Sequence, residues 1–464
     1  MSAHSSGSPA DSVGILVPGG MLGAGFPAAT IARGIALGAD VITIDAGSTD
    51  SGPHYLGTGT GKNSREALRR DLRMLLRASD AARIPLIVGS CDTSGTDDGV
   101  DRVADIVREI MDEEDLHLDI ASIYSEQTPG TILEHLRAGR VHPLAPAAEL
   151  TATDVSRCQR IVAVMGHEPI TKALQDGADV VLAGRATDTA LSAAFGLMLG
   201  MPAGPAWHAA KIMECGGQCT NAPLSGGVFA RIDATGFTIE PLDPQASCTP
   251  QSVAAHMMYE TANPFRMREP AGTLIVSDAT YTALDDRRVR VQGSLFEPAS
   301  QLTIKLEGAA LCGFQTMTFS AIRDPLILAQ IDSWAARFKE ILAVRVDQIL
   351  DVPPGDYDTD LRLYGYNAVL DTLDPHPPIP QEVGAMLLIN APSQELATAV
   401  AKIANPMMLH LPAASMSHLP SFAFAFSPAE TERGAQYEFV LNHVVDVDRG
   451  DQMFRTRMTR RRHA

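Results

Sequence analysis

Several features that mark secreted or membrane proteins are scarce in this chain. Six cysteines in 464 residues are too few and too scattered for a disulfide framework. No apolar run reaches the roughly 18 residues that a membrane span needs, and the small, polar N-terminus lacks the charged and apolar regions of a signal peptide. We therefore expect a soluble, cytoplasmic protein with reduced thiols and no membrane partner.

Positive charge is also in short supply. The chain has 37 Lys and Arg residues against 55 Asp and Glu residues, a formal net charge of −18. Because so acidic a surface repels polyanions, we expect no nucleic-acid partner. A small anionic substrate remains compatible with this charge, provided that backbone N–H groups or a few placed Arg and Lys side chains bind it.

Aromatic residues make up only 5% of the chain, which favours packed α/β layers over a β-sandwich. Up to about residue 245, apolar strand-like segments alternate with helical segments, a pattern typical of a parallel sheet covered on both faces. Later segments alternate with period two, as antiparallel or mixed strands do. We expect an α/β fold with a mostly parallel Rossmann-like sheet over residues 13–245, a mixed α+β region over residues 246–464, and a disordered leader over residues 1–12.

Three loops rich in Gly, Ser, Thr and Asp follow the most apolar predicted strands. They are Asp45–Ser51, Ser90–Gly95 and Gly184–Asp188, and the first and third share a GADV strand, an Ala-Gly step and a final Thr-Asp. Ligands of parallel sheets bind at the carboxyl ends of the strands, where backbone donors can approach an anion. The alternative is that these Ser, Thr and Asp residues only cap helices. Three such loops together favour a substrate site.

The side chains of these loops suggest acid–base chemistry. Asp45 or Asp50 is the predicted general base, Asp188 occupies the matching place in the third loop, and carboxylates crowded together raise one another's pKa. The backbones of Ser48–Ser51 and Ser90–Gly95 are predicted oxyanion donors. Arg185 is the predicted carboxylate clamp, with a structural ion pair as its alternative. The predicted substrate-binding residues are Gly23, Gly25, Ser48, Thr49, Ser51, Ser90, Asp92, Thr93, Gly184, Arg185, Thr187 and Gln218.

Two further motifs carry weaker signals. The turn with Gly23 and Gly25 lacks the spacing of a dinucleotide fingerprint and predicts a phosphate or carboxylate cradle instead. In MECGGQC (213–219), Cys215 is a candidate nucleophile or ligand, although a buried Cys more often only fills space.

A metal is a minority alternative. Asp45, Asp50, Asp92 and Asp188 offer the oxygen ligands that Mg²⁺ prefers, and no Cys/His spacing predicts zinc. We therefore assign no metal ligands and leave the cofactor undetermined, with a divalent metal as the alternative.

At several motifs the chain resembles the acyclic terpene utilisation AtuA family. The likeness lies in DAGSTDSGP (45–53), IPLIVGS (84–90), GADVVLAGRATDTA (177–190), ECGGQ (214–218) and SVAAHMMYETANP (252–264), of which the first is the most specific. The chain departs from the pattern in a late Gly226–Gly227 doublet and in Cys91, which stands where the family has a small residue. The resemblance implies a bacterial catabolic protein that handles branched or carboxylated acyl compounds.

Together these observations predict a catabolic enzyme acting on a small carboxylate or its CoA thioester, as a lyase, hydratase or isomerase. The predicted catalytic residues are Asp45, Asp50, Asp188 and Cys215. One alternative is an accessory, non-catalytic subunit of a catabolic complex, and a weaker one is a Mg²⁺-dependent hydrolase. We expect a homo-oligomer or a complex with a small partner protein.

Overall fold

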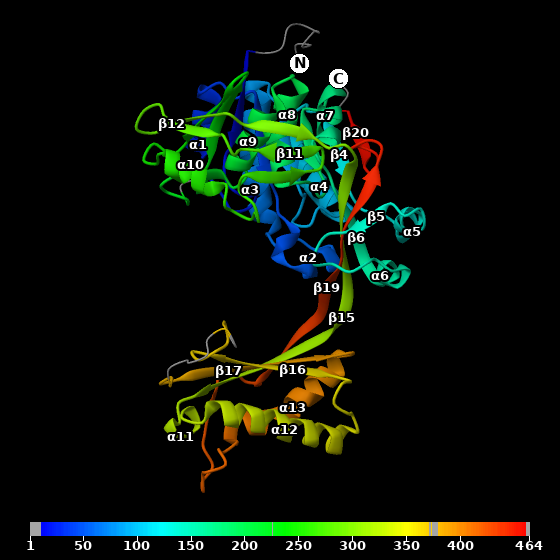
Figure 1. Cartoon of the computed structure of the whole chain (residues 1–464), viewed down its shortest axis with the longest axis vertical. Helices are drawn as coiled ribbons and strands as arrows, with labels where there is room; N and C mark the ends of the chain where they lie inside the picture. The colour runs from blue at the N-terminus through cyan, green and yellow to red at the C-terminus, as the bar shows by residue number, and fades with distance from the viewer. Residues whose placement is uncertain (1–10, 225, 371–372, 374–378, 461–464) are drawn as a thin grey trace. The chain divides into compact units, whose positions relative to one another are not determined.

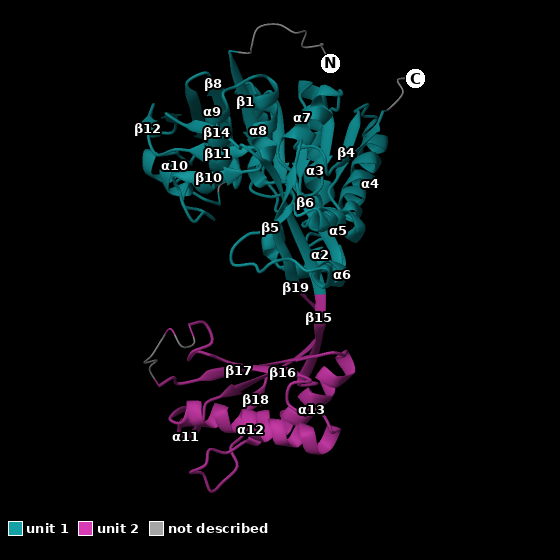
Figure 2. Ribbon diagram, turned by 45° about the vertical axis from the view of Figure 1, so that its right-hand side comes forward, with its two compact units in different colours: residues 1–310, 439–464 teal, residues 311–438 magenta. Residues whose placement is uncertain are grey.

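The computed structural model describes residues 11–224, 226–370, 373 and 379–460, and the chain divides into two compact units (Figures 1 and 2). Unit 1 is Met1–Ala310 with Phe439–Ala464, and unit 2 is Leu311–Glu438. The chain passes between the units within strands β15 (Leu302–Ile322) and β19 (Glu430–Val447). The predicted boundary near residue 245 lies inside unit 1. Most of the predicted leader lies outside the described residues, but Ser12 already begins strand β1 (Ser12–Val17).

A ten-stranded sheet forms the centre of unit 1, in the order β12-β13-β9-β8-β1-β2-β3-β7-β4-β20. Besides β1, its strands are β2 (Val41–Asp45), β3 (Leu86–Gly89), β4 (Ile120–Tyr124), β7 (Val180–Ala183), β8 (Val228–Asp233), β9 (Gly236–Pro241), β12 (Thr280–Ala283), β13 (Val289–Gln292) and β20 (Arg455–Thr459). The five strands from β1 to β4 in this order pair in parallel, and all the others pair antiparallel.

The prediction of a mostly parallel, Rossmann-like sheet is therefore correct only for the five central strands. The chain is a mixed α/β protein in which antiparallel pairs predominate. The physical reason lies in short connections, since two residues between β8 and β9 can join only antiparallel neighbours. The later segments β12 and β13 extend the same sheet beyond β9.

Helices cover both faces of the parallel strands. On one face lie α1 (Ala28–Ala36), α3 (Arg65–Ala82) and α4 (Asp97–Glu114), and on the other lie α7 (Glu168–Gln175), α8 (Asp188–Met198) and α9 (Ala203–Met213). Side chains alternate between faces along a strand, so Val41 packs in one core and Ile42 in the other. Each central strand is thus apolar along most of its length, as the sequence predicts.

Shorter elements complete unit 1. They are η1 (Thr49–Ser51), α2 (Pro53–Thr58), α5 (Pro129–Arg137), β5 (Val141–Pro143), α6 (Ala152–Arg157), β6 (Cys158–Val164), η2 (Gly216–Cys219), α10 (Pro250–His256), β10 (Arg266–Glu269), β11 (Gly272–Ile275) and β14 (Leu295–Pro298). Strands β10, β11 and β14 form a separate antiparallel sheet. The first half of β15 pairs with β6, which places Glu307 opposite Val162.

Unit 2 has a simpler plan. Its elements are the second half of β15, α11 (Pro325–Leu328), α12 (Ile331–Leu350), β16 (Asp358–Tyr364), β17 (Val383–Ala391), α13 (Gln394–His410), β18 (Ala423–Phe424) and the first part of β19. The sheet order β16-β17-β15-β19 and the sequence β-α-β-β-α-β are those of a ferredoxin-like fold. Helices α12 and α13 pack on this sheet through Trp334, Phe338 and Val400. Within the described part of the chain, no helix has both the length and the apolarity to cross a membrane.

Candidate active site

Two adjoining cavities of unit 1 lie at the carboxyl ends of β2 and β7. The charged cavity has a volume of about 550 Å³ and the loop cavity about 460 Å³. Both are lined by Ser48, Asp50, Asp188, Glu214 and Glu260. Because ligands of parallel α/β sheets bind beyond the carboxyl ends of the strands, these two cavities form the candidate active site.

The charged cavity mixes both signs of charge. Its acidic residues are Asp50, Asp188, Glu214, Glu260, Glu269 and Glu307, and its basic residues are Arg185, Lys211, Arg268 and Lys305. Six carboxyls thus face four cations. An anionic substrate fits such a wall only if some carboxyls hold protons or if another cation is present.

Asp45 and Asp188 are two carboxyls of the candidate site that hold a proton more tightly than usual. Asp45 ends β2 and lines the loop cavity, and Asp188 begins α8 directly after the loop that follows β7. Burial and the charge of Asp188 raise the pKa of Asp45 well above its usual range. Burial also raises the pKa of Asp188, and Asp50 and Glu260 add to this effect while Arg185 opposes it. The two carboxyls therefore titrate as a pair that retains a proton at higher pH than free carboxyls do.

The hydrogen bonds of Asp45 leave one oxygen unused. Its Oδ2 accepts a hydrogen bond of 3.1 Å from the Gly47 backbone N–H. Its Oδ1 is buried and has no hydrogen-bond partner among the described residues. A buried acceptor without a donor is costly, so a water or a substrate atom in the loop cavity is its natural partner.

Arg185 is held by the protein itself rather than left free to clamp a substrate. Its Nε lies 3.0 Å from Glu307 Oε2, and its Nη1 donates to the Ala186 carbonyl at 2.8 Å and to Ser90 Oγ at 3.2 Å. Asp188 Oδ1 lies 3.6 Å from the same Nη1. The alternative of a structural ion pair is thus present, with a glutamate from β15 as the main partner. The remaining Nη2 is what this cavity residue can still offer to a ligand.

Besides Arg185, Glu307 contacts Thr49 and Lys305. Its Oε2 also accepts from Thr49 Oγ1 at 2.8 Å, and its Oε1 lies 2.7 Å from Lys305 Nζ. Burial alone would raise the pKa of Glu307, but Arg185 and Lys305 outweigh it and lower the pKa to about 2. Thr49 is therefore a structural partner of β15 that uses its hydroxyl hydrogen on Glu307, while the residue also lines the charged cavity.

The remaining residues of the first predicted loop differ in whether they cap a helix or line the cavities. Ser48 Oγ caps η1 by accepting from the Asp50 N–H at 3.3 Å, and Ser48 and Asp50 line both cavities. Ser51 Oγ pairs with Lys62 Nζ at 2.9 Å and lies outside both linings. Thr187, at the start of α8, lines the charged cavity without capping the helix by its side chain. The capping alternative is thus present at Ser48.

The Ser90–Gly95 loop is buried, and its backbone is already engaged. The N–H groups of Ser90, Cys91 and Thr93 donate to the carbonyls of Gly184, Ala183 and Ala46 at 2.9–3.2 Å. Ser90, Asp92 and Thr93 have left-handed backbones, with φ of 44°, 52° and 81°. Three amides of this loop are thus engaged with the neighbouring loops, and the role of the loop as a source of oxyanion donors stays a prediction.

Besides Ser51 and Ser90, three further predicted binding residues of these loops lie outside the linings of both cavities. Asp92 Oδ2 pairs with Arg102 Nε at 2.8 Å and lines a different cavity of unit 1. Thr93 Oγ1 accepts from the Lys62 N–H at 3.0 Å. Gly184 packs against Ser125 and donates to the Ile123 carbonyl at 2.7 Å. The loop acts as a buried support for Arg185.

The glycine cradle predicted at Gly23 and Gly25 exists, and the protein fills it with its own carboxylate. Their N–H groups donate to Asp71 Oδ2 at 2.8 and 3.1 Å, and both residues have positive φ. Asp71 comes from α3 and is fully buried. The expectation that these amides bind a substrate anion is therefore corrected, although Gly25 still borders the loop cavity.

Lys211, on α9, is a cavity residue that the sequence analysis did not single out. It is 4% exposed, pairs with Glu214 and donates to the Tyr259 carbonyl at 3.0 Å. Nearby, Glu269 Oε2 accepts from Thr189 Oγ1 at 2.9 Å, and burial raises the pKa of Glu269 to about 8. The available sequence signal was a single lysine within the apolar segment AWHAAKIM. No local signal marked Glu269.

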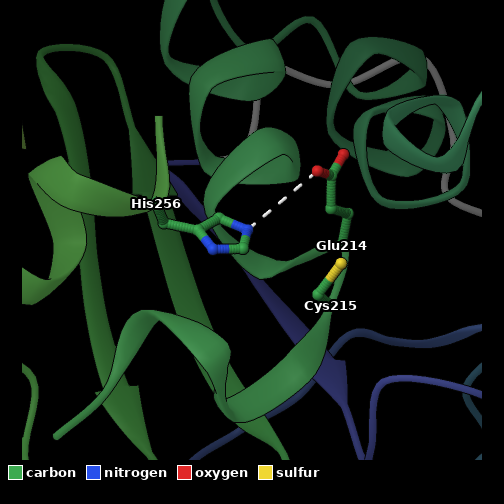
Figure 3. Close-up of side chains that lie close together, drawn as sticks. All are labelled: Glu214, Cys215 and His256. Carbon is green, nitrogen blue, oxygen red and sulfur yellow. Dashed lines mark ion pairs between the residues drawn. The ribbon is translucent and has the colours of Figure 1, made fainter. Parts of the chain in front are cut away.

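The Cys215 segment borders the loop cavity, together with Gln218. Burial, with Glu214 second, raises the pKa of the Cys215 thiol, so the thiolate that a nucleophile needs is disfavoured. Glu214, Cys215 and His256 nevertheless lie close enough together to hold a metal ion, with ligand atoms within 4.8 Å of one another (Figure 3).

The comparisons with known proteins agree with the resemblance seen in the motifs. No curated protein and no solved structure matches the chain. A family model described as acyclic terpene utilisation family protein AtuA matches residues 61–443. That range includes Arg185, Asp188 and Lys211 and begins after the DAGSTDSGP segment (45–53). Because the match covers most of the sequence, the chain belongs to the acyclic terpene utilisation AtuA family.

Proposed function

We propose that this protein is a catabolic enzyme that acts on a small carboxylate or its CoA thioester through acid–base chemistry at Asp45 and Asp188. The family's name connects the chain with the utilisation of acyclic terpenes. The observation that carries the proposal is the unpartnered Oδ1 of Asp45 beside the loop cavity, within the electrostatic influence of Asp188.

In the proposed reaction the ionised Asp45 takes a proton from the carbon next to the substrate carbonyl. The electron pair of the broken C–H bond moves onto the carbonyl oxygen and forms an enolate. The ammonium of Lys211 lines the charged cavity as a hydrogen-bond donor to that oxygen, and the charge of Asp188 makes Asp45 more basic. If the enolate collapses to a C=C bond while the group on the next carbon departs with its electron pair, the enzyme is a lyase or hydratase. If the proton returns to another carbon or to the opposite face, the enzyme is an isomerase.

The two carboxyls suit a base because two like charges in a buried site do not both ionise readily. The charge of Asp188 therefore makes Asp45 hold its proton more tightly, which strengthens Asp45 as a base. Burial raises the pKa of both carboxyls. The pKa of the base therefore lies closer to the working pH, where general-base catalysis is most effective.

Proton exchange tests this proposal even when the product is not identified. The purified chain is incubated in D₂O with a panel of short acyl-CoA thioesters and free carboxylates, and loss of the α-proton signal is followed by NMR. We expect exchange with at least one compound and a loss of at least 100-fold in Asp45→Asn, the scale of one catalytic base. Asp115→Asn is the control, because the Asp115 side chain is 95% exposed. Exchange unchanged in Asp45→Asn would refute the role of Asp45.

The same assay addresses the alternatives. A non-catalytic subunit would show no exchange with any compound until a partner protein is added. A Mg²⁺-dependent hydrolase would release free acid from the thioester only when Mg²⁺ is supplied, and would exchange no α-proton. Either result would replace the proposed reaction.

A further inference from the structure

Glu214, Cys215 and His256 form a cluster that the proposed acid–base reaction does not use. Glu214 and Cys215 follow the end of α9, and His256 is the last residue of α10, more than forty positions later in the chain. Their ligand atoms lie within 4.8 Å of one another, and Figure 3 shows the imidazole of His256 and the carboxylate of Glu214 facing each other. His256 Nε2 is 4.0 Å from Glu214 Oε1.

His256 supplies the observation that points to a ligand. Its side chain is 3% exposed, and its Nε2 has no hydrogen-bond partner among the described residues. The ring stacks on Tyr259, with 5.5 Å between the ring centroids. Stacking and burial fix the ring, and its unpartnered Nε2 is the kind of imidazole nitrogen that binds metals.

The three donors have the chemistry of a transition-metal site. A nitrogen, a sulfur and a carboxylate oxygen together suit Zn²⁺ and its neighbours rather than Mg²⁺, which prefers oxygen alone. Ligands of a tetrahedral zinc ion lie about 3.3–3.8 Å apart, so side-chain rotations that bring the donors about 1 Å closer complete the site. Three protein ligands leave a fourth position for water or substrate.

The charges around the cluster are compatible with an added cation. The charged cavity has six carboxyls and four cations on its wall. Lys211 now pairs with Glu214, and its second contact, the Tyr259 carbonyl at 3.0 Å, can retain the ammonium when the carboxylate turns toward a metal. The lysine therefore competes with the metal for Glu214.

We propose that Glu214, Cys215 and His256 bind a divalent transition-metal ion of the zinc class, with its open position toward the loop cavity, which Glu214 and Cys215 line. The ion's role in catalysis rests on the proposed function, since it would polarise the substrate carbonyl beside Asp45. Binding of the ion does not depend on that function.

Cobalt spectroscopy tests the site on the full-length protein. Chelator-treated protein is titrated with Co²⁺, which shows visible d–d bands in a tetrahedral site and a near-ultraviolet charge-transfer band when a thiolate is bound. We expect one ion per chain with both signals. Cys215→Ser should lose the charge-transfer band, and His256→Gln should weaken Co²⁺ binding at least tenfold. Cys312→Ser is the matched control, because Cys312 is exposed and lies in unit 2.

A further variant distinguishes loss of the metal site from loss of folding. Lys211→Met removes the competing ammonium, so it should tighten Co²⁺ binding, an effect that a damaged protein would not show. No Co²⁺ binding by the wild type, or binding unchanged in both Cys215→Ser and His256→Gln, would refute the site. Such a failure is distinct from failure of the proposed function, which is judged by α-proton exchange at Asp45 in protein with and without added metal.

Discussion

Replacing Glu307 by glutamine tests whether the buried charges around Arg185 hold unit 1 together. The Glu307 side chain is 6% exposed, and its two oxygens contact Arg185, Lys305 and Thr49 at 2.7–3.0 Å. Glutamine keeps the shape and removes the charge. It leaves the Arg185 side chain, which is 10% exposed, without its main counter-ion.

The expected cost is large because a buried charge loses its partner. Breaking a buried ion pair in this way typically destabilises a protein by about 3–5 kcal/mol. We expect the lower end, about 3 kcal/mol, since Asp188 Oδ1 remains 3.6 Å from Arg185 Nη1 and becomes the replacement partner. Asp188 should then hold its proton less tightly, because Arg185 already lowers its pKa and would no longer be shared with Glu307.

Urea unfolding, followed by a probe within unit 1, measures this cost as a change in the free energy of unfolding. Glu297→Gln is the control, because the pair of Glu297 with Arg266 is exposed, with 61% and 49% of the side chains accessible. Such surface pairs contribute only about 0–1 kcal/mol. A Glu307→Gln variant no less stable than the control would refute the view that the Arg185 cluster supports the site.

The pH dependence of the same variant gives a second measure. The pKa of Glu307 is about 2 in the folded protein, below its ordinary value of 4.5. Its charge therefore stabilises the fold above pH 4.5, and this contribution is lost as the pH falls toward 2. The difference in unfolding free energy between wild type and Glu307→Gln should shrink over that interval.

Two further predictions concern the glycine cradle and the proposed base. Asp71→Asn removes the charge that the Gly23 and Gly25 N–H groups bind, and should destabilise the protein by about 1.5–3 kcal/mol in urea unfolding; an unchanged midpoint would contradict the role of the buried carboxylate. The rate of α-proton exchange should rise with pH through a range above the ordinary aspartate value of about 4, because the raised pKa of Asp45 delays formation of the base. A rate that reaches its plateau at the ordinary carboxyl pKa would exclude Asp45 as that base.

Local patterns in the sequence predicted a substantial part of the fold and of the site. The GADV segments correctly indicated β2 and β7 as buried parallel strands, and their loops carry Asp45 and Asp188 to the same pair of cavities. These features depend on the alternation of side chains along a strand and on loops leaving the carboxyl ends of parallel strands. Both are encoded within short stretches of consecutive residues.

The partners of those residues come from distant segments, and only the tertiary structure brings them together. Glu307 reaches Arg185 from β15, Asp71 reaches Gly23 from α3, and His256 reaches Glu214 from α10. A glycine-rich loop has the same sequence pattern whether its N–H groups bind a substrate anion or a buried carboxylate of the protein. Which of these occurs depends on how helices and sheets pack across long separations in the chain, and no local pattern records that packing. The sequence by itself therefore determined the strands and the loops that end at the cavities, whereas the tertiary structure decided which of their donors and charges remain free to act.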